Sequence, residues 1–226
     1  KRNFLSYINK NFVFESNPKI AVAVSGGPDS MALLHLLNNW SKTVKGKINA
    51  LIIDHKLRNN SKEEALSISQ IIKNYNINVK VLSVNKAMII SKSMSEARIN
   101  RYNLLTEYCK KNKISYLFLG HHFDDNLETF VNRKISGSDF DGLQSIKEIS
   151  LRNKTCLIRP LLNYSKNEIL NYNSNNNIPF IEDPSNKNFH YTRPIIRKFM
   201  QDADANILKE IINEFELIKK NSMLYN

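Results

Sequence analysis

The stretch from Lys19 to Ser30 constrains the fold most, because an apolar run, a glycine turn and a helix start follow one another directly. Ile20 to Val24 is short, apolar and rich in β-branched residues, which is typical of a buried parallel strand. Gly26 and Gly27 let the backbone approach a ligand closely, since no Cβ stands in the way. The apolar stretch Met31 to Leu37 then predicts a helix, whose N-terminal N–H groups and dipole favour an anion.

The residue types in this turn indicate which anion it binds. Asp29 would repel a phosphate unless a cation lay between them, so the turn predicts a nucleotide carrying Mg²⁺. The dinucleotide and Walker fingerprints are both absent. Ser25-Gly-Gly-Pro-Asp-Ser30 instead resembles the signature of the PP-loop ATP pyrophosphatases, which cleave ATP between its α and β phosphates. The alternative is an ordinary connection between a strand and a helix.

Further apolar runs continue this beginning into an α/β pattern. Predicted strands at residues 47–54, 79–84, 115–120 and 155–162 alternate with helices. Together with the first strand they predict a doubly wound, five-stranded parallel sheet with helices on both faces. We expect a PP-loop ATP-binding catalytic domain at 1–188. A C-terminal helical extension follows at 189–226, either a helical linker or the start of a tRNA-binding region.

Composition narrows the partners and the compartment. The 226 residues carry a formal net charge of +12, which fits either a lysine-rich solvated surface or a polyanion partner. The two cysteines, Cys109 and Cys156, lie far apart and predict neither a zinc site nor a disulfide framework. No signal peptide and no apolar run of about 18 residues is present, so we expect a cytoplasmic protein without a membrane span.

The segment after the fourth predicted strand carries the densest polar cluster. If a helix starts at His121, then His121, Asp125 and Glu128 share one helical face. His122 and Asp124 then point elsewhere. Three interpretations remain open: acids that stabilise the helix dipole, a divalent metal site, or a site that binds and deprotonates a cationic amine. An alkyl ammonium has a pKa of about 10.4, so it must lose a proton before it can attack as a nucleophile.

Taken together, the motifs resemble one PP-loop family, the tRNA(Ile)-lysidine synthetases. They occur in the family's order and span about 170 residues of the sequence. The matching segments are Ser25–Ser30, Asp54-His-Lys-Leu-Arg58, Glu96-Ala-Arg-Ile-Asn-Arg-Tyr102, Leu119-Gly-His-His-Phe-Asp-Asp-Asn-Leu-Glu-Thr129, Arg159-Pro-Leu-Leu162 and Asp183-Pro-Ser-Asn186. The block at 119–129 is the most specific of them.

The resemblance implies an ATP- and Mg²⁺-dependent ligase with two substrates besides ATP. These are the isoleucine tRNA with a CAU anticodon and free L-lysine. The wobble cytidine O2 attacks the α-phosphate, which gives an adenylated base and pyrophosphate. The lysine side-chain amine then attacks C2 and releases AMP. The resemblance is also compatible with a homodimer.

The resemblance also assigns roles by sequence position. Residues expected to hold ATP are Ser25, Gly26, Gly27, Pro28, Asp29, Ser30, Asp54, His55 and Arg58, with Asp29 near Mg²⁺. Arg101 would stabilise phosphate charge in the transition state. His121, Asp125 and Glu128 would hold lysine and help to deprotonate its amine. Arg193 and Arg197 would contact tRNA phosphates.

Two positions depart from the family pattern. Lys56 stands where the family usually has glycine, so the turn after the second strand is expected to differ. Pro194 replaces the asparagine that usually follows the first of the two C-terminal arginines.

Other functions weighed against this one are a tRNA-thiolating PP-loop enzyme, an amidotransferase-type synthetase and a non-catalytic binding module. Thiolation needs a reactive cysteine, whereas Cys109 and Cys156 are expected to be buried in a helix and a strand. An amidotransferase function would not explain the strong positive charge. A non-catalytic module would not explain why the acidic residues of the motifs are intact.

Overall fold

A computed structural model describes residues 4–54, 56, 61–73, 75, 77–84, 94–181 and 192–222. Its helices are α1 (Phe4–Asn11), α2 (Pro28–Thr43), α3 (Ser61–Lys73), α4 (Met94–Lys111), α5 (Phe123–Ile135), α6 (Phe140–Leu143), α7 (Lys166–Asn175), α8 (Thr192–Asp202) and α9 (Ala205–Ser222). Its strands are β1 (Lys19–Val24), β2 (Lys47–Asp54), β3 (Asn78–Ser83), β4 (Tyr116–Phe118), β5 (Ile149–Arg152) and β6 (Thr155–Ile158).

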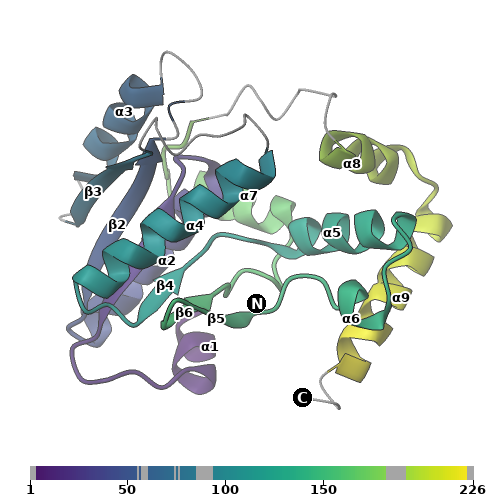
Figure 1. The fold of residues 1–226 in the computed structure, drawn as a ribbon, viewed down its shortest axis with the longest axis horizontal. Helices are drawn as coiled ribbons and strands as arrows, with labels where there is room; N and C mark the ends of the chain where they lie inside the picture. The colour runs from purple at the N-terminus through teal and green to yellow at the C-terminus, as the bar shows by residue number, and fades with distance from the viewer. Residues whose placement is uncertain are drawn as a thin grey trace.

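The strands form one sheet in the order β3-β2-β1-β4-β6-β5 (Figure 1). The first five strands in this order run parallel, and the register of β1 on β2 pairs Lys19 with Lys47 and Val24 with Ile52. The order reverses its direction at β1, because β2 and β3 lie on one side of β1 whereas β4 and β6 lie on the other. This reversal confirms the doubly wound fold that the sequence predicts.

The prediction of five strands was wrong by one, because β5 adds an antiparallel edge strand. A two-residue turn joins β5 to β6, and both turn residues, Asn153 and Lys154, have positive φ angles of 48° and 64°. Such a turn matches the twist of paired antiparallel strands. β5 has only four residues, and Ile149 and Leu151 are exposed on it, so its pattern does not stand out from a loop.

Alternate residues of β1 pack into two hydrophobic cores, one on each face of the sheet. Ile20, Val22 and Val24 belong to the core beneath α1, α2, α3 and α7. Ala21 belongs to the core on the opposite face, where α4 contributes residues such as Leu105. Because both faces of the strand are buried, its sequence is a continuous apolar run rather than an alternating one.

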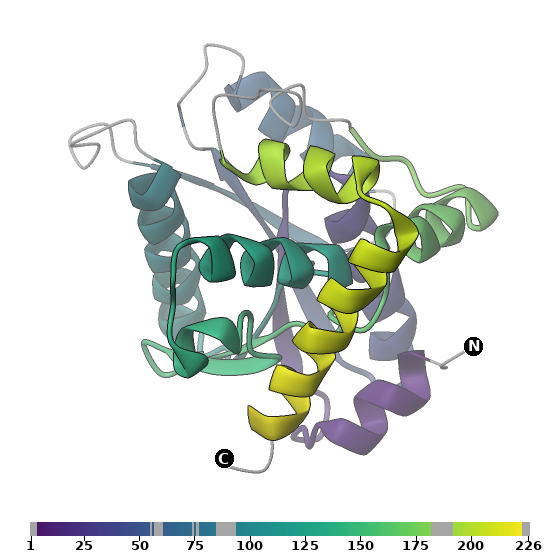
Figure 2. The ribbon, with the colours of Figure 1, turned by 90° about the vertical axis from the view of Figure 1, so that its right-hand side faces the viewer.

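A third cluster lies to one side of the sheet, where α5, α6, α8 and α9 gather (Figures 1 and 2). Phe215 of α9 is almost fully buried there, with its ring centroid 5.9 Å from that of Phe123 and 5.4 Å from that of Phe130. The C-terminal helices therefore pack on α5, which begins at the candidate site. The domain boundary predicted at residue 188 lies outside the described residues.

No helix in the described ranges has both the length and the apolar character needed to cross a membrane.

Candidate functional site

The ends of β1 and β4 bring two polar segments together at the point where the strand order reverses. Gly120 makes this approach close: a Cβ on it would lie 3.2 Å from the backbone carbonyl carbon of Asp29 and 3.2 Å from the backbone nitrogen of Ser30. Open α/β sheets bind ligands at such a point, outside the carboxyl ends of the strands. The start of α2 and the segment after β4 therefore form one candidate site.

The loop at 25–30 is closed by its own serines. The backbone N–H of Ser25 donates to Ser30 Oγ at 3.2 Å, and Ser30 Oγ donates to the Gly27 carbonyl at 3.0 Å. Gly26 has a φ of 84°, a conformation that favours glycine. Since α2 begins at Pro28, the N–H groups of its first turn have no helical acceptor four residues earlier. They can bind an anion, as the sequence predicts.

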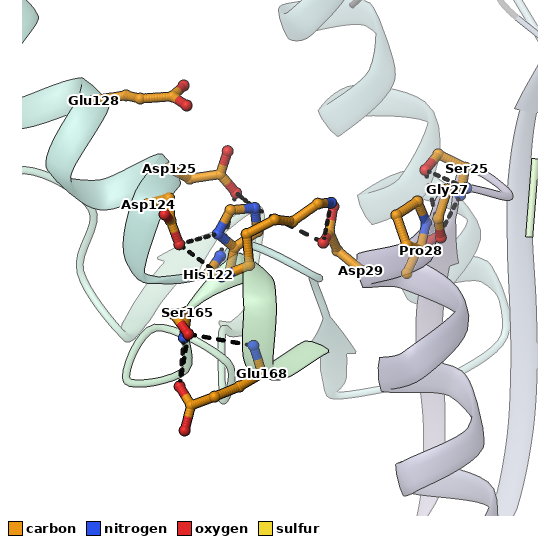
Figure 3. Close-up of polar contacts among 12 residues, drawn as sticks. Ser25, Gly27, Pro28, Asp29, His122, Asp124, Asp125, Glu128, Ser165 and Glu168 are labelled. Atoms are coloured by element: carbon orange, nitrogen blue, oxygen red, sulfur yellow. Dashed lines mark hydrogen bonds and ion pairs between the residues drawn. The ribbon is translucent and has the colours of Figure 1, made fainter. Parts of the chain in front are cut away.

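His122 lies at the centre of the facing cluster (Figure 3). Its Nε2 is 3.5 Å from Asp125 Oδ2 and 3.8 Å from Asp29 Oδ1, and its Nδ1 is 3.3 Å from Asp124 Oδ2. Burial lowers the pKa of His122, but the hydrogen bond to Asp124 and the charges of Asp125 and Asp29 outweigh it and raise that pKa above 6.5. The cluster therefore favours an imidazolium that joins α2 to α5.

The expectation that His121 shares a helical face with Asp125 and Glu128 was wrong, because α5 begins at Phe123. His121 lies before the helix, where helical spacing does not apply. His122 is the N-cap residue, and its backbone N–H donates to Asp125 Oδ2 at 3.2 Å. N-cap side chains commonly fold back over the first turn, so His122 faces the acidic residues instead of pointing away.

Lys166, the first residue of α7, also reaches this cluster. Its Nζ lies 2.5 Å from Asp29 Oδ1, and its backbone N–H donates to Asp124 Oδ2 at 2.7 Å. This backbone bond and the bond from His122 lower the pKa of Asp124, although burial opposes the shift. Asp124 was expected to point elsewhere, and it instead connects α5 to the start of α7.

Glu128 has a partner that the sequence did not predict. Its side chain is 1% exposed, and its two carboxylate oxygens accept hydrogen bonds from Arg197 of α8, at 2.7 Å from Nε and 3.2 Å from Nη2. The bond to Glu128 raises the pKa of Arg197 despite partial burial, and the charges of Asp125 and Asp29 add to it. The guanidinium group of Arg197 is therefore held within electrostatic range of the cluster.

Asp54 is 2% exposed and organises the turn after β2. It accepts hydrogen bonds from the Lys56 N–H at 3.0 Å, Ser61 Oγ at 2.7 Å and Ser83 Oγ at 3.2 Å. Lys56 has a φ of 52°, which explains why glycine suits this position. His55 and Arg58 lie outside the described residues, as does the side chain of Arg193.

Arg101 belongs to a cluster of guanidinium groups around the buried ring of Tyr102. The Cζ atoms of Arg98, Arg101 and Arg152 lie 5.3, 5.4 and 5.1 Å from the ring centroid. Burial raises the pKa of Tyr102, but the positive charges of Arg98, Arg159 and Arg101 outweigh it and lower the pKa. The transition-state role of Arg101 remains a prediction.

The described residues contain no group of three or more His, Cys, Asp or Glu side chains arranged to hold a metal ion. A nucleotide-bound Mg²⁺ needs less, because it keeps several waters and uses one or two carboxylates besides the phosphates. Asp29 already has a cation, the ammonium of Lys166, against its carboxylate. Asp29 lies in the first turn of α2, and its role as a metal ligand stays a prediction.

Comparison with known proteins places the fold and the motifs in a family. A family model described as a PP-loop domain matches residues 1–203. The chain belongs to the PP-loop family. Membership in this family supports ATP as the nucleotide. The assignment of the loop at 25–30 as the PP-loop stays a prediction.

Curated relatives narrow the similarity within the family. The tRNA(Ile)-lysidine synthase of Orientia tsutsugamushi is 39% identical over 98% of this chain, which covers 50% of that protein. The tRNA(Ile)-lysidine synthase of Wolbachia pipientis wMel is 38% identical over 93% of this chain, covering 48% of its own length. The chain thus spans about half the length of the curated relatives it matches.

Two solved structures share the fold at low sequence identity. The U34-tRNA thiolase NcsA from Methanococcus maripaludis, solved with its [4Fe-4S] cluster, superposes with a TM-score of 0.77 at 20% identity. The match covers 96% of this chain and 78% of that one. NMN synthetase from Francisella tularensis gives a TM-score of 0.54 at 15% identity, over 97% of this chain and 90% of that one.

Sequence reasoning missed His122, Lys166 and the pairing of Glu128 with Arg197. Histidine is not a residue type that marks an N-cap, so no local pattern placed the start of α5 at Phe123, two residues later than assumed. The capping box of Ser165 and Glu168 marks the beginning of α7 at Lys166. No local signal relates Lys166 to Asp29, 137 positions away.

Proposed function

We propose that this chain is the catalytic part of a tRNA(Ile)-lysidine synthetase, a ligase that joins lysine to C2 of the wobble cytidine with ATP as the energy source. The observation that carries the proposal is the meeting of an ATP-binding PP-loop with a buried, acid-lined histidine at one point of the sheet. Similarity to curated lysidine synthases along almost the whole chain supports the same reaction.

In the first step, the PP-loop holds the β and γ phosphates and leaves the α-phosphate open. The N–H groups of the first turn of α2 bind phosphate oxygens, and Ser25 and Ser30 supply hydroxyl groups. The cytidine O2 attacks the α-phosphorus, and the bond to the β-phosphate oxygen breaks to release pyrophosphate. Mg²⁺ brought by ATP would neutralise phosphate charge, with Asp29 as its ligand from the protein.

In the second step, the lysine side-chain amine attacks C2 of the adenylated cytidine. The bond from C2 to the activated oxygen breaks and AMP leaves. We assign Asp125, whose side chain is 19% exposed beside His122, to hold the incoming ammonium and accept its proton. We assign His121, which is half-buried and lies between β4 and α5, to hold lysine together with Asp125.

Glu128 acts in this proposal through Arg197. Both oxygens of its buried carboxylate are occupied by the guanidinium group, which leaves little capacity for a substrate amine. Arg197 is itself 41% exposed, so its remaining donors can meet a tRNA phosphate at the edge of the site. Glu128 is thus a positioning residue for the tRNA contact that the resemblance implied.

The cysteines weigh against thiolation. Burial raises the pKa of Cys109 to about 12, and it raises the pKa of Cys156 despite the opposing charge of Arg159. A thiol with a raised pKa is a poor nucleophile at neutral pH. The sequence has two cysteines in all, whereas a [4Fe-4S] cluster is usually held by four cysteine ligands.

Incorporation of labelled lysine into isoleucine tRNA is the direct test. The wild-type protein, given ATP and Mg²⁺, should transfer the label to the tRNA with a CAU anticodon and release AMP and pyrophosphate. Asp125→Ala should abolish transfer while ATP still binds. Full incorporation by Asp125→Ala would refute the site assignment, and transfer of sulfur instead of lysine would establish thiolation.

A further inference from the structure

We propose that Lys166 is a phosphate-binding residue of the PP-loop, held on Asp29 in the nucleotide-free protein and transferred to the polyphosphate when Mg·ATP binds. The inference rests on the proposed use of ATP at this loop. No motif in the sequence marks Lys166. Its assignment depends on what its backbone and its side chain contact.

Three sets of hydrogen bonds fix the start of α7, and with it the backbone of Lys166. Ser165 and Glu168 form a reciprocal capping box, with the Ser165 N–H donating to Glu168 Oε2 at 2.8 Å. Asp124 accepts the Lys166 N–H, and the Asn173 amide further along α7 donates to the Pro28 carbonyl at 2.9 Å. These contacts attach α7 to both α5 and the start of α2. Its first residue is therefore placed beside the PP-loop.

The side chain of Lys166, in contrast, is held at its tip. Its Nζ bonds Asp29 Oδ1, and both side chains are partly exposed, at 34% and 26%. An ion pair of this exposure contributes little to folding, so stability alone gives little reason for it. A lysine carries a compact charge on a flexible four-carbon stem, so the ammonium can move while the backbone stays in place.

The charge balance of the site predicts the direction of that movement. Asp29, Asp124 and Asp125 surround His122, and a nucleoside triphosphate would add further negative charge at the start of α2. A metal ion on Asp29 would compete with the Lys166 ammonium for the same carboxylate. The displaced ammonium would then be able to bind the phosphates, since lysine commonly binds phosphate as a point charge.

Binding measurements test the inference without catalysis. Lys166→Met keeps the stem and removes the charge, whereas Lys166→Arg keeps the charge. The probes are Mg²⁺ with an α,β-methylene analogue of ATP, which cannot be cleaved at that bond, and adenosine, which has no phosphate. Lys110→Met, on the exposed last turn of α4, controls for the loss of one positive charge from this basic chain.

Isothermal titration calorimetry should show that Lys166→Met weakens binding of the analogue by about tenfold or more, while Lys166→Arg stays within about threefold of wild type. Adenosine binding should be the same in all four proteins. Equal or tighter binding of the analogue by Lys166→Met would overturn the inference, because the ammonium would then be only a competitor of the metal. An equal loss of adenosine binding would overturn it as well, by showing a structural effect.

The same titrations separate this inference from the proposed function. If the wild-type protein binds the analogue and Lys166→Met binds it equally well, only the role of Lys166 fails. If the wild-type protein does not bind the analogue at all, the use of ATP at this loop fails with it.

Discussion

The ion pair of Glu128 and Arg197 gives a sharp prediction for stability, because its two members differ so much in exposure. The Glu128 side chain is 1% exposed, and both of its oxygens depend on Arg197, which is 41% exposed. Breaking a fully buried ion pair by removing one partner costs about 3–5 kcal/mol. Since Arg197 is partly solvated, we expect Arg197→Met to lower the free energy of unfolding by about 2–3 kcal/mol.

The reverse truncation should cost less. Glu128→Gln removes the buried charge but keeps its shape, and water can reach the remaining guanidinium group, so we expect a loss of about 1 kcal/mol. The double variant should lose about 1–2 kcal/mol, less than the sum of the two single losses, because it leaves no buried carboxylate without a partner.

Urea denaturation followed by far-ultraviolet circular dichroism measures all four corners of this cycle. Lys209→Met, an exposed position on α9, provides a matched loss of positive charge. If Arg197→Met costs no more than Lys209→Met, Glu128 does not depend on Arg197 and the proposed attachment of α8 to the site is refuted. A strictly additive cycle would contradict the coupling in the same way.

Three further predictions concern packing, backbone strain and pH. Phe215→Ala should lower the free energy of unfolding by about 3–5 kcal/mol in urea denaturation, because it leaves a cavity at the almost fully buried contact between α9 and α5. A smaller loss than that caused by an exposed substitution such as Leu217→Ala would contradict the packing. Lys56→Gly should raise the thermal midpoint and increase the free energy of unfolding by about 0.5–1 kcal/mol, since φ is 52° there and a side chain costs energy in that conformation. A fall in the midpoint would show that the contacts of the Lys56 side chain stabilise the fold by more than its backbone strain costs. Burial alone would raise the pKa of Asp54, but hydrogen bonds from Ser61, the Lys56 N–H and Ser83 lower it below 3.8. The ionised Asp54 carboxylate therefore stabilises the folded protein above that pH, and this stabilisation is lost as the pH falls through the folded-state pKa. Asp54→Asn should therefore be clearly less stable than wild type at pH 7 and approach it at pH 3; a difference that stays constant between these pH values would refute the assignment.

Local patterns in the sequence predicted most of the individual elements. The bounds of β2 agree with prediction, because a strand that is buried on both faces is a continuous apolar run of neighbouring residues. β5 escaped prediction because it is short, lies at the edge of the sheet and exposes its apolar residues. The start of α5 was placed two residues early, which gave His121 a helical face that it does not have.

The sequence by itself determined the fold class, the glycine turn between β1 and α2 and the presence of an acidic segment after β4, because each depends on residues close together in the chain. Only the tertiary structure decided how the charges are paired. Asp29 meets Lys166 across 137 positions, and Glu128 meets Arg197 across 69. Such pairings follow from the order of strands in the sheet, from the packing of α7 against α2 and from the packing of α8 against α5. The identity of an acidic residue in the sequence does not show whether a substrate or another side chain neutralises its carboxylate.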